Sequence, residues 1–142
     1  MKRIFLFLLL IVNFNKAIAS LEGETLICDK DTRGYNFISK DKVKVSGINL
    51  NKLKIFSINH SYEINENAIF IQQPLKALDN KEKPRPIGWI FRRTLDYVSL
   101  DYVNGDWGRK FLWSCETTSS EQLKIRIKNK LNELIKVNGK KL

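Results

Sequence analysis

The sequence has 142 residues, with 25 Lys and Arg against 15 Asp and Glu, one His and two Cys. This length suits a single domain, and a hydrophobic fraction of 43% excludes an intrinsically disordered chain. One His and two Cys are too few for most zinc or iron–sulfur sites. We therefore expect no metal, no cofactor and no catalytic set.

The first segment predicts export. Lys2 and Arg3 precede the apolar run Ile4–Val12, and Ala17-Ile18-Ala19 supplies the small residues of a signal-peptidase site. The alternative is an uncleaved membrane anchor, but this run is shorter than the roughly 20 residues that a spanning helix needs. We predict a signal peptide over residues 1–19, cleaved after Ala19, and a periplasmic or secreted mature chain without a transmembrane segment.

Short β-rich runs separated by Asn, Gly, Asp or Lys follow over residues 20–117, and they predict a mainly β fold, an antiparallel meander or small barrel. His60 is predicted to lie in a solvated turn between two strands, and Gln72 to Gly88, with its three prolines, in one long connection. The predicted strands are Thr25–Cys28, Tyr35–Ile38, Val43–Val45, Leu53–Ile58, Tyr62–Ile64, Ala68–Ile71, Trp89–Phe91, Tyr97–Val103 and Lys110–Cys115.

Asn104-Gly105 is the strongest local signal, because this dipeptide between two alternating runs is typical of a two-residue hairpin turn. Such a turn pairs Tyr102 with Trp107 and Val98 with Phe111. One face of the hairpin then becomes a predicted core face. Its members are Val98, Leu100, Tyr102, Trp107, Phe111, Trp113 and Cys115. The alternative is an exposed aromatic platform that stacks on bases or sugars.

The last segment, residues 118–142, predicts one amphipathic helix packed on the β domain. A capping box is formed by Ser119 with Gln122 or by Thr118 with Glu121, and Asn138-Gly139 ends the helix. The predicted packing stripe is Leu123, Ile127, Leu131 and Leu134. The flanks are a candidate face for weak contact with an anionic envelope surface or polymer, through Lys124, Arg126, Lys128, Lys130 and Lys136.

Positive charge is concentrated in this tail. Residues 121–142 hold seven Lys and Arg and two Glu, whereas residues 20–120 carry a net charge of only +2. Charge alone is therefore a weak indication of an anionic partner for the β domain.

The predicted export determines how the two cysteines are interpreted. In an oxidising compartment Cys28 and Cys115 are predicted to form a disulfide that joins the first strand of the mature chain to the last. A redox or nucleophilic thiol is the alternative, but no Cys-x-x-Cys motif and no neighbouring His supports it.

Residues that could carry catalysis are sparse. Asp96 and Asp101 lie five residues apart, which places them on opposite faces of one strand and excludes a paired-carboxylate site. The alternative function, a small secreted hydrolase acting on an anionic polymer, would use His60, Glu116 or Asp106. The first hypothesis is a non-enzymatic β domain that binds a ligand or an envelope partner.

The Leu26-Ile27-Cys28 strand, the Ile90-Phe91-Arg92-Arg93-Thr94-Leu95 segment and the second Cys after a last hairpin resemble small exported bacterial proteins of unassigned function. The resemblance covers the two ends of the mature chain. It implies a small β fold with one disulfide and carries over no catalytic residue. The basic C-terminal helix departs from that pattern.

Overall fold

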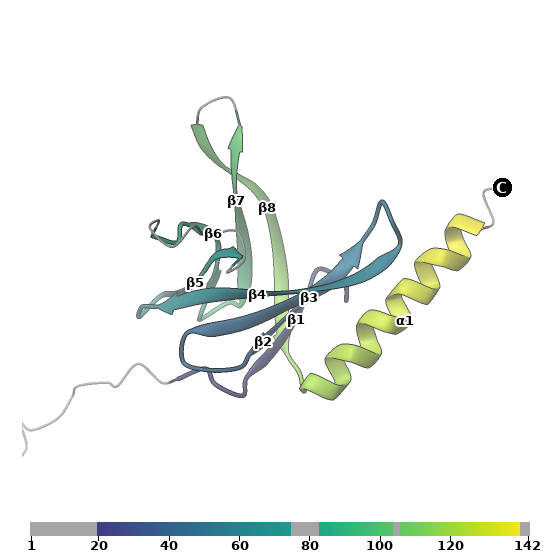
Figure 1. Ribbon diagram of the computed structural model, residues 1–142, viewed down its shortest axis with the longest axis horizontal. Coiled ribbons are helices and arrows are strands. Elements are labelled where there is room, and N and C mark those ends of the chain that lie inside the picture. Colours follow the sequence, from purple (N-terminus) through teal and green to yellow (C-terminus); the bar gives the residue numbers. More distant parts are fainter. Residues whose placement is uncertain (1–19, 75–82, 104–105, 140–142) are drawn as a thin grey trace, which may run out of the picture.

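The computed structural model describes residues 20–74, 83–103 and 106–139, and it is mainly β (Figure 1). Its elements are β1 (Thr25–Cys28), β2 (Arg33–Phe37), β3 (Lys42–Asn49), β4 (Lys54–Ile64), β5 (Ala68–Pro74), β6 (Pro86–Phe91), β7 (Asp96–Val103), β8 (Asp106–Thr117) and α1 (Ser120–Gly139). The predicted fold class is confirmed. The helix that the structure describes is not apolar enough to cross a membrane. The predicted signal peptide lies outside the described residues.

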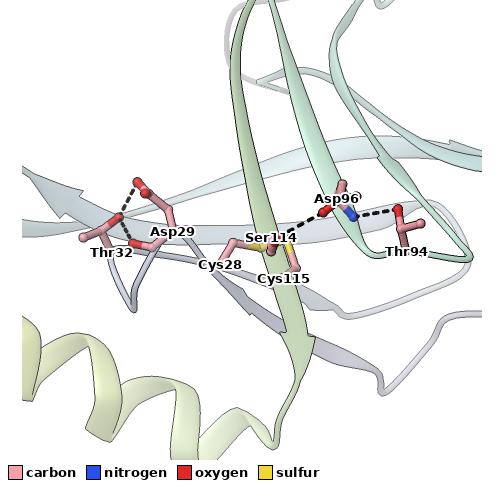
Figure 2. The surroundings of a disulfide bond; sticks show 7 residues. All are labelled: Cys28, Asp29, Thr32, Thr94, Asp96, Ser114 and Cys115. Carbon is pink, nitrogen blue, oxygen red and sulfur yellow. Dashed lines mark hydrogen bonds between the residues drawn. A yellow bond between two sulfur atoms is a disulfide. The ribbon is translucent and has the colours of Figure 1, made fainter.

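The eight strands form a closed antiparallel barrel in which each strand pairs with the next. The first and last strands close it, since Leu26, Ile27 and Cys28 of β1 pair with Thr117, Glu116 and Cys115 of β8. The predicted disulfide between Cys28 and Cys115 is confirmed and lies on this closing pair (Figure 2). It therefore bridges two residues 87 positions apart at the seam of the barrel.

Side chains that alternate along each strand fill the barrel interior. Tyr35 and Phe37 of β2, Val43 of β3, Ile71 of β5 and Ile90 of β6 are almost completely buried there. Phe37 packs edge-on against Tyr62, with ring centroids 4.9 Å apart, and helps to fill the end where β1 begins. At the opposite end, where β2, β4 and β6 begin, the interior holds a cavity.

The prediction for His60 is wrong. A single continuous strand, β4, runs from Lys54 to Ile64, and His60 is only 6% exposed within it. Polar Asn59 and Ser61 are typical of a turn, but here they are the outward-facing neighbours of an inward-facing His. The predicted Gln72–Gly88 connection is also too long, because β5 extends to Pro74 and β6 begins at Pro86.

The hairpin register is confirmed near its turn, where Tyr102 pairs with Trp107. An irregularity between Val98 and Leu100 shifts the pairing, so Val98 lies opposite Leu112 and not Phe111. The predicted pairing of Val98 is therefore wrong, although Val98 is buried as predicted. Trp113 and Cys115 pack on the core, with Tyr97. The turn Asn104-Gly105, and the side chains of 101–107 and 109–111, lie outside the described residues.

The helix α1 lies along one side of the barrel, over β1 to β4 (Figure 1). Ser119 caps it, since its Oγ accepts a hydrogen bond from the backbone N–H of Gln122 at 3.1 Å. Leu123 and Ile127 are buried against Ile27 and Ile48, and the partly buried remainder of the predicted stripe, Leu131 and Leu134, packs beside them.

Gly34 provides the space for this contact. A Cβ at Gly34 would lie 2.1 Å from a methyl carbon of Leu123, closer than non-bonded atoms can approach. The first turn of the helix is therefore seated on a bare stretch of the β2 backbone.

Candidate functional site

A cavity of about 250 Å³ lies inside the end of the barrel where β2, β4 and β6 begin. Its apolar wall comes from Val45, Phe56, Ile58, Ile71, Pro74 and Ile87. Four polar side chains complete the lining, namely Arg33, Tyr35, His60 and Tyr97. An apolar cavity with a few convergent polar groups is the usual form of a small-molecule site.

Aromatic rings stack along one side of this cavity. The ring of Tyr97 lies 5.5 Å from that of Tyr35 and 4.6 Å from that of Trp113, nearly parallel to the latter. Gly88 makes room for Tyr97, because a Cβ there would lie 2.3 Å from the Tyr97 hydroxyl. The stack fixes the Tyr97 ring in place as part of the wall.

Arg33 brings a positive charge into this end of the barrel. It is the first residue of β2 and is half-buried, with its guanidinium carbon 5.6 Å from the Phe56 ring centroid and 5.5 Å from that of Trp113. These cation–π contacts hold the guanidinium between two rings.

No carboxylate of the described residues pairs with Arg33. The nearest acids in sequence are used elsewhere. Asp29 accepts a hydrogen bond from the Thr32 hydroxyl at 2.7 Å, and Asp31 pairs with Arg126. The barrel end therefore has a fixed cation whose charge is not balanced by a partner inside the cavity.

Tyr35 is 1% exposed, and its hydroxyl completes no hydrogen bond among the described residues, although the side chains of Tyr97 and Arg33 lie close enough to affect its pKa. Burial raises the pKa of Tyr35 well above its ordinary value, and the neighbouring Tyr97 adds to the rise. The hydroxyl therefore keeps its proton and is available as a donor. A buried donor without an acceptor costs stability, so its presence in a cavity wall calls for a functional reason.

His60 is held by a hydrogen bond of 2.7 Å between its Nδ1 and the backbone carbonyl of Gln72. A carbonyl oxygen only accepts, so Nδ1 carries the proton. Burial lowers the pKa of His60 below 6.5, and nearby Arg33 lowers it further, against the opposing effect of the Gln72 hydrogen bond. His60 is therefore a neutral ring in the wall at pH 7.

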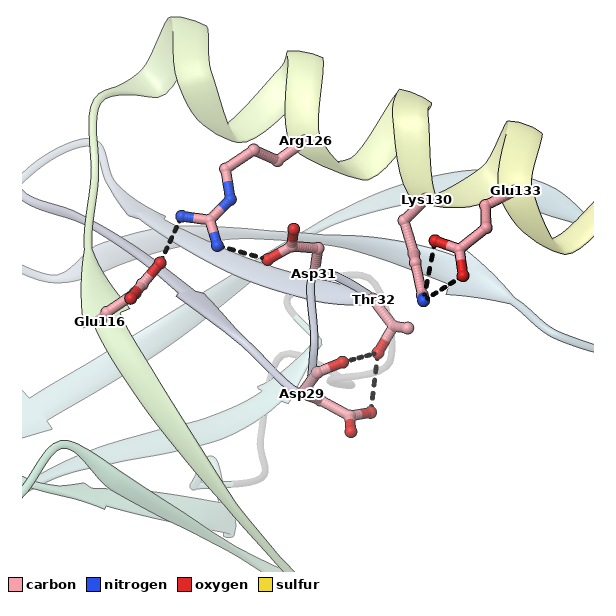
Figure 3. A network of polar contacts seen from close by, with 7 residues as sticks. All are labelled: Asp29, Asp31, Thr32, Glu116, Arg126, Lys130 and Glu133. Carbon is pink, nitrogen blue, oxygen red and sulfur yellow. Dashed lines mark hydrogen bonds and ion pairs between the residues drawn. The ribbon is translucent and has the colours of Figure 1, made fainter.

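A larger depression of about 480 Å³ lies outside the barrel, between the disulfide, the β1–β2 turn and α1. Three of its charged groups pair with one another (Figure 3). Arg126 donates to Asp31 at 2.6 Å and to Glu116, and these hydrogen bonds raise the pKa of Arg126. This arrangement ties the helix to the barrel. Lys30 also lines the depression, where it is exposed and forms no ion pair with the described residues.

Some residues of the predicted anionic-partner face are exposed, and others form ion pairs within the protein. Lys124, Lys128 and Lys136 are exposed on α1, whereas Arg126 binds Asp31 and Glu116. Lys130 donates to Glu133 at 3.1 Å. The charge available to an external anion is therefore smaller than the sequence implies.

Of the candidate hydrolase groups, the two whose side chains are described do not converge. His60 lines the cavity inside the barrel, Glu116 lies on the outside against Arg126, and the side chain of Asp106 is outside the described residues. Within the described ranges, no three His, Cys, Asp or Glu side chains lie close enough together to hold a metal ion.

Sequence reasoning missed Arg33, Tyr35 and Tyr97. The predicted strand begins at Tyr35, whereas β2 begins two residues earlier, at Arg33. The signal was the spacing of Arg33, Tyr35 and Phe37, three large side chains two residues apart, which places all three on one face.

Comparison of this chain with protein-family models, with curated proteins and with solved structures gives no match. The resemblance to small exported proteins stays a prediction.

Proposed function

We propose that this chain is an exported, non-enzymatic binding protein that holds a small, mainly apolar molecule in the end of its barrel where β2, β4 and β6 begin, here called the open end. The observation that carries this proposal is the cavity of about 250 Å³ with its apolar wall and unbalanced Arg33. Eight-stranded barrels have an interior just wide enough to be filled by side chains or to hold one small ligand.

The size of the cavity limits the ligand. Sites for drug-sized molecules usually occupy about 300–1,000 Å³, and this cavity is slightly smaller. We therefore expect a compact molecule, such as a small aromatic or short aliphatic compound, and not a long-chain lipid.

Export is part of the proposal. A disulfide between the first and last strands is typical of proteins that fold in an oxidising compartment. The predicted signal peptide, cleaved after Ala19, would deliver the chain there. Mass spectrometry of the exported protein tests this step, because the mature chain should begin at Ser20, and an intact Met1 would contradict it.

The binding site is tested by filling the cavity from its rim. Ile58 lines the cavity and is 39% exposed, so Ile58→Trp should occupy the space without disturbing the core. Ile55, on the opposite face of the same strand and 47% exposed, does not line the cavity, and Ile55→Trp is the matched control.

Isothermal titration would use a panel of hexanoate, 3-phenylpropionate and their amides. The wild type and Ile55→Trp should bind members of this panel, and Ile58→Trp should lose that binding. No binding to the wild type, or equal binding to Ile58→Trp, would refute the proposed site.

A further inference from the structure

We infer that the ligand of the barrel cavity is a monocarboxylate, whose carboxylate is taken by the Arg33 guanidinium and the Tyr35 hydroxyl. This inference rests on the proposed function, because it specifies the chemistry of the molecule held in the same cavity.

Arg33 supplies the positive charge that would bind a carboxylate. Its guanidinium lies between the Phe56 and Trp113 rings, and no carboxylate of the described residues balances it. A half-buried cation gains most from an anion that enters the same desolvated space. The planar fork of a guanidinium also matches the two oxygens of a carboxylate.

Tyr35 supplies a hydrogen-bond donor to the same cavity. The hydroxyl is buried and lacks an acceptor among the described residues, and burial raises the pKa of Tyr35, so it donates and does not ionise. The proton on Nδ1 of His60 is already used by Gln72. An acceptor on the ligand would satisfy the Tyr35 donor, whereas a protonated amine, which only donates, would not.

The remaining lining limits the ligand to one negative charge. Among the described residues that line the cavity, Arg33 is the one charged side chain, and no Lys or second Arg accompanies it. A phosphate ester carries close to two charges at neutral pH and would leave one unbalanced against apolar walls. Val45, Ile71 and Ile87 instead offer contact to a hydrocarbon or aromatic body.

The test compares each acid of the titration panel with its own amide, which keeps the shape and removes the charge. The wild type should bind hexanoate and 3-phenylpropionate about tenfold or more tighter than the amides, because charge-assisted hydrogen bonds are roughly twice as strong as neutral ones. Arg33→Gln should abolish this difference. Arg93→Gln is the control of equal charge change, since Arg93 is exposed in the turn at the other end of the barrel.

Tyr35→Phe separates binding from folding. It removes a buried hydroxyl that has no partner in the described structure, so the melting temperature should stay the same or rise while affinity for the acids falls several-fold. A lower melting temperature with unchanged affinity would assign the hydroxyl a structural role and overturn its part in binding.

The outcomes distinguish the two proposals. Equal binding of acids and amides in the wild type would overturn the carboxylate inference and leave the proposed function standing. Failure of every compound to bind would overturn both. An acid preference that persists in Arg33→Gln would show that another group recognises the charge.

Discussion

Removing the disulfide should strongly destabilise the barrel. The bond joins β1 to β8, the pair of strands that closes the barrel, and it spans 87 residues of sequence. In the chain-entropy treatment, a loop of this length corresponds to about 4.6 kcal/mol of stability at 25 °C. For a domain of this size, roughly 4 °C per kcal/mol converts that figure to a fall of about 15–20 °C in Tm.

Urea unfolding followed by circular dichroism would measure this loss. The double variant Cys28→Ala and Cys115→Ala should lower the free energy of unfolding by about 3–5 kcal/mol. Wild type unfolded in the presence of a reductant should lose slightly less, because it keeps the two buried sulfur atoms. A loss below about 1 kcal/mol in both cases would refute the reasoning, since a typical native disulfide contributes more.

Three further predictions follow from the packing and from the barrel interior. Gly34→Ala should lower stability by about 1–3 kcal/mol in the same unfolding assay, because its Cβ would collide with Leu123; unchanged stability would mean that the helix is not seated there. Leu131→Asp should lower Tm strongly, because Leu131 packs on the buried cluster. Changing Lys124, Lys128 and Lys130 together to Gln should leave Tm nearly unchanged, because these side chains are exposed or paired only at the surface. The reverse result would contradict the docking of α1. His60 has a lower pKa in the folded than in the unfolded state, so the unfolded state binds the proton more tightly. Stability should therefore fall as pH drops through 6.5, and pH-dependent thermal melts of His60→Gln should show a smaller fall.

The elements that depend on local pattern were predictable. The helix stripe, the Ser119 cap and the core position of Cys115 follow from periodicity and capping chemistry within a few residues. The disulfide was predicted from the expected export and the presence of two cysteines. None of these inferences requires knowledge of how distant strands pair.

The barrel interior was harder to predict because its inward positions depend on strand pairing over the whole chain. Along β4, inward-facing residues alternate with polar residues of the kind that are typical of a turn. The inward-facing residues are Phe56, Ile58, His60, Tyr62 and Ile64. The register shift beyond Val98 moved the inward position to Tyr97, and no turn residue marks that shift. Arg33 becomes a site residue only once β2 is placed beside Phe56 and Trp113.

The most direct test of the account is the location of ligand binding within the barrel. Isoleucine methyl NMR suits it, because Ile58, Ile71 and Ile87 line the cavity whereas Ile125 and Ile135 are exposed on α1. Titration with 3-phenylpropionate should shift the three cavity methyls and leave the two helix methyls unchanged. Shifts confined to the helix, or no shifts at a saturating concentration, would contradict the proposal that the open end of the barrel is the binding site.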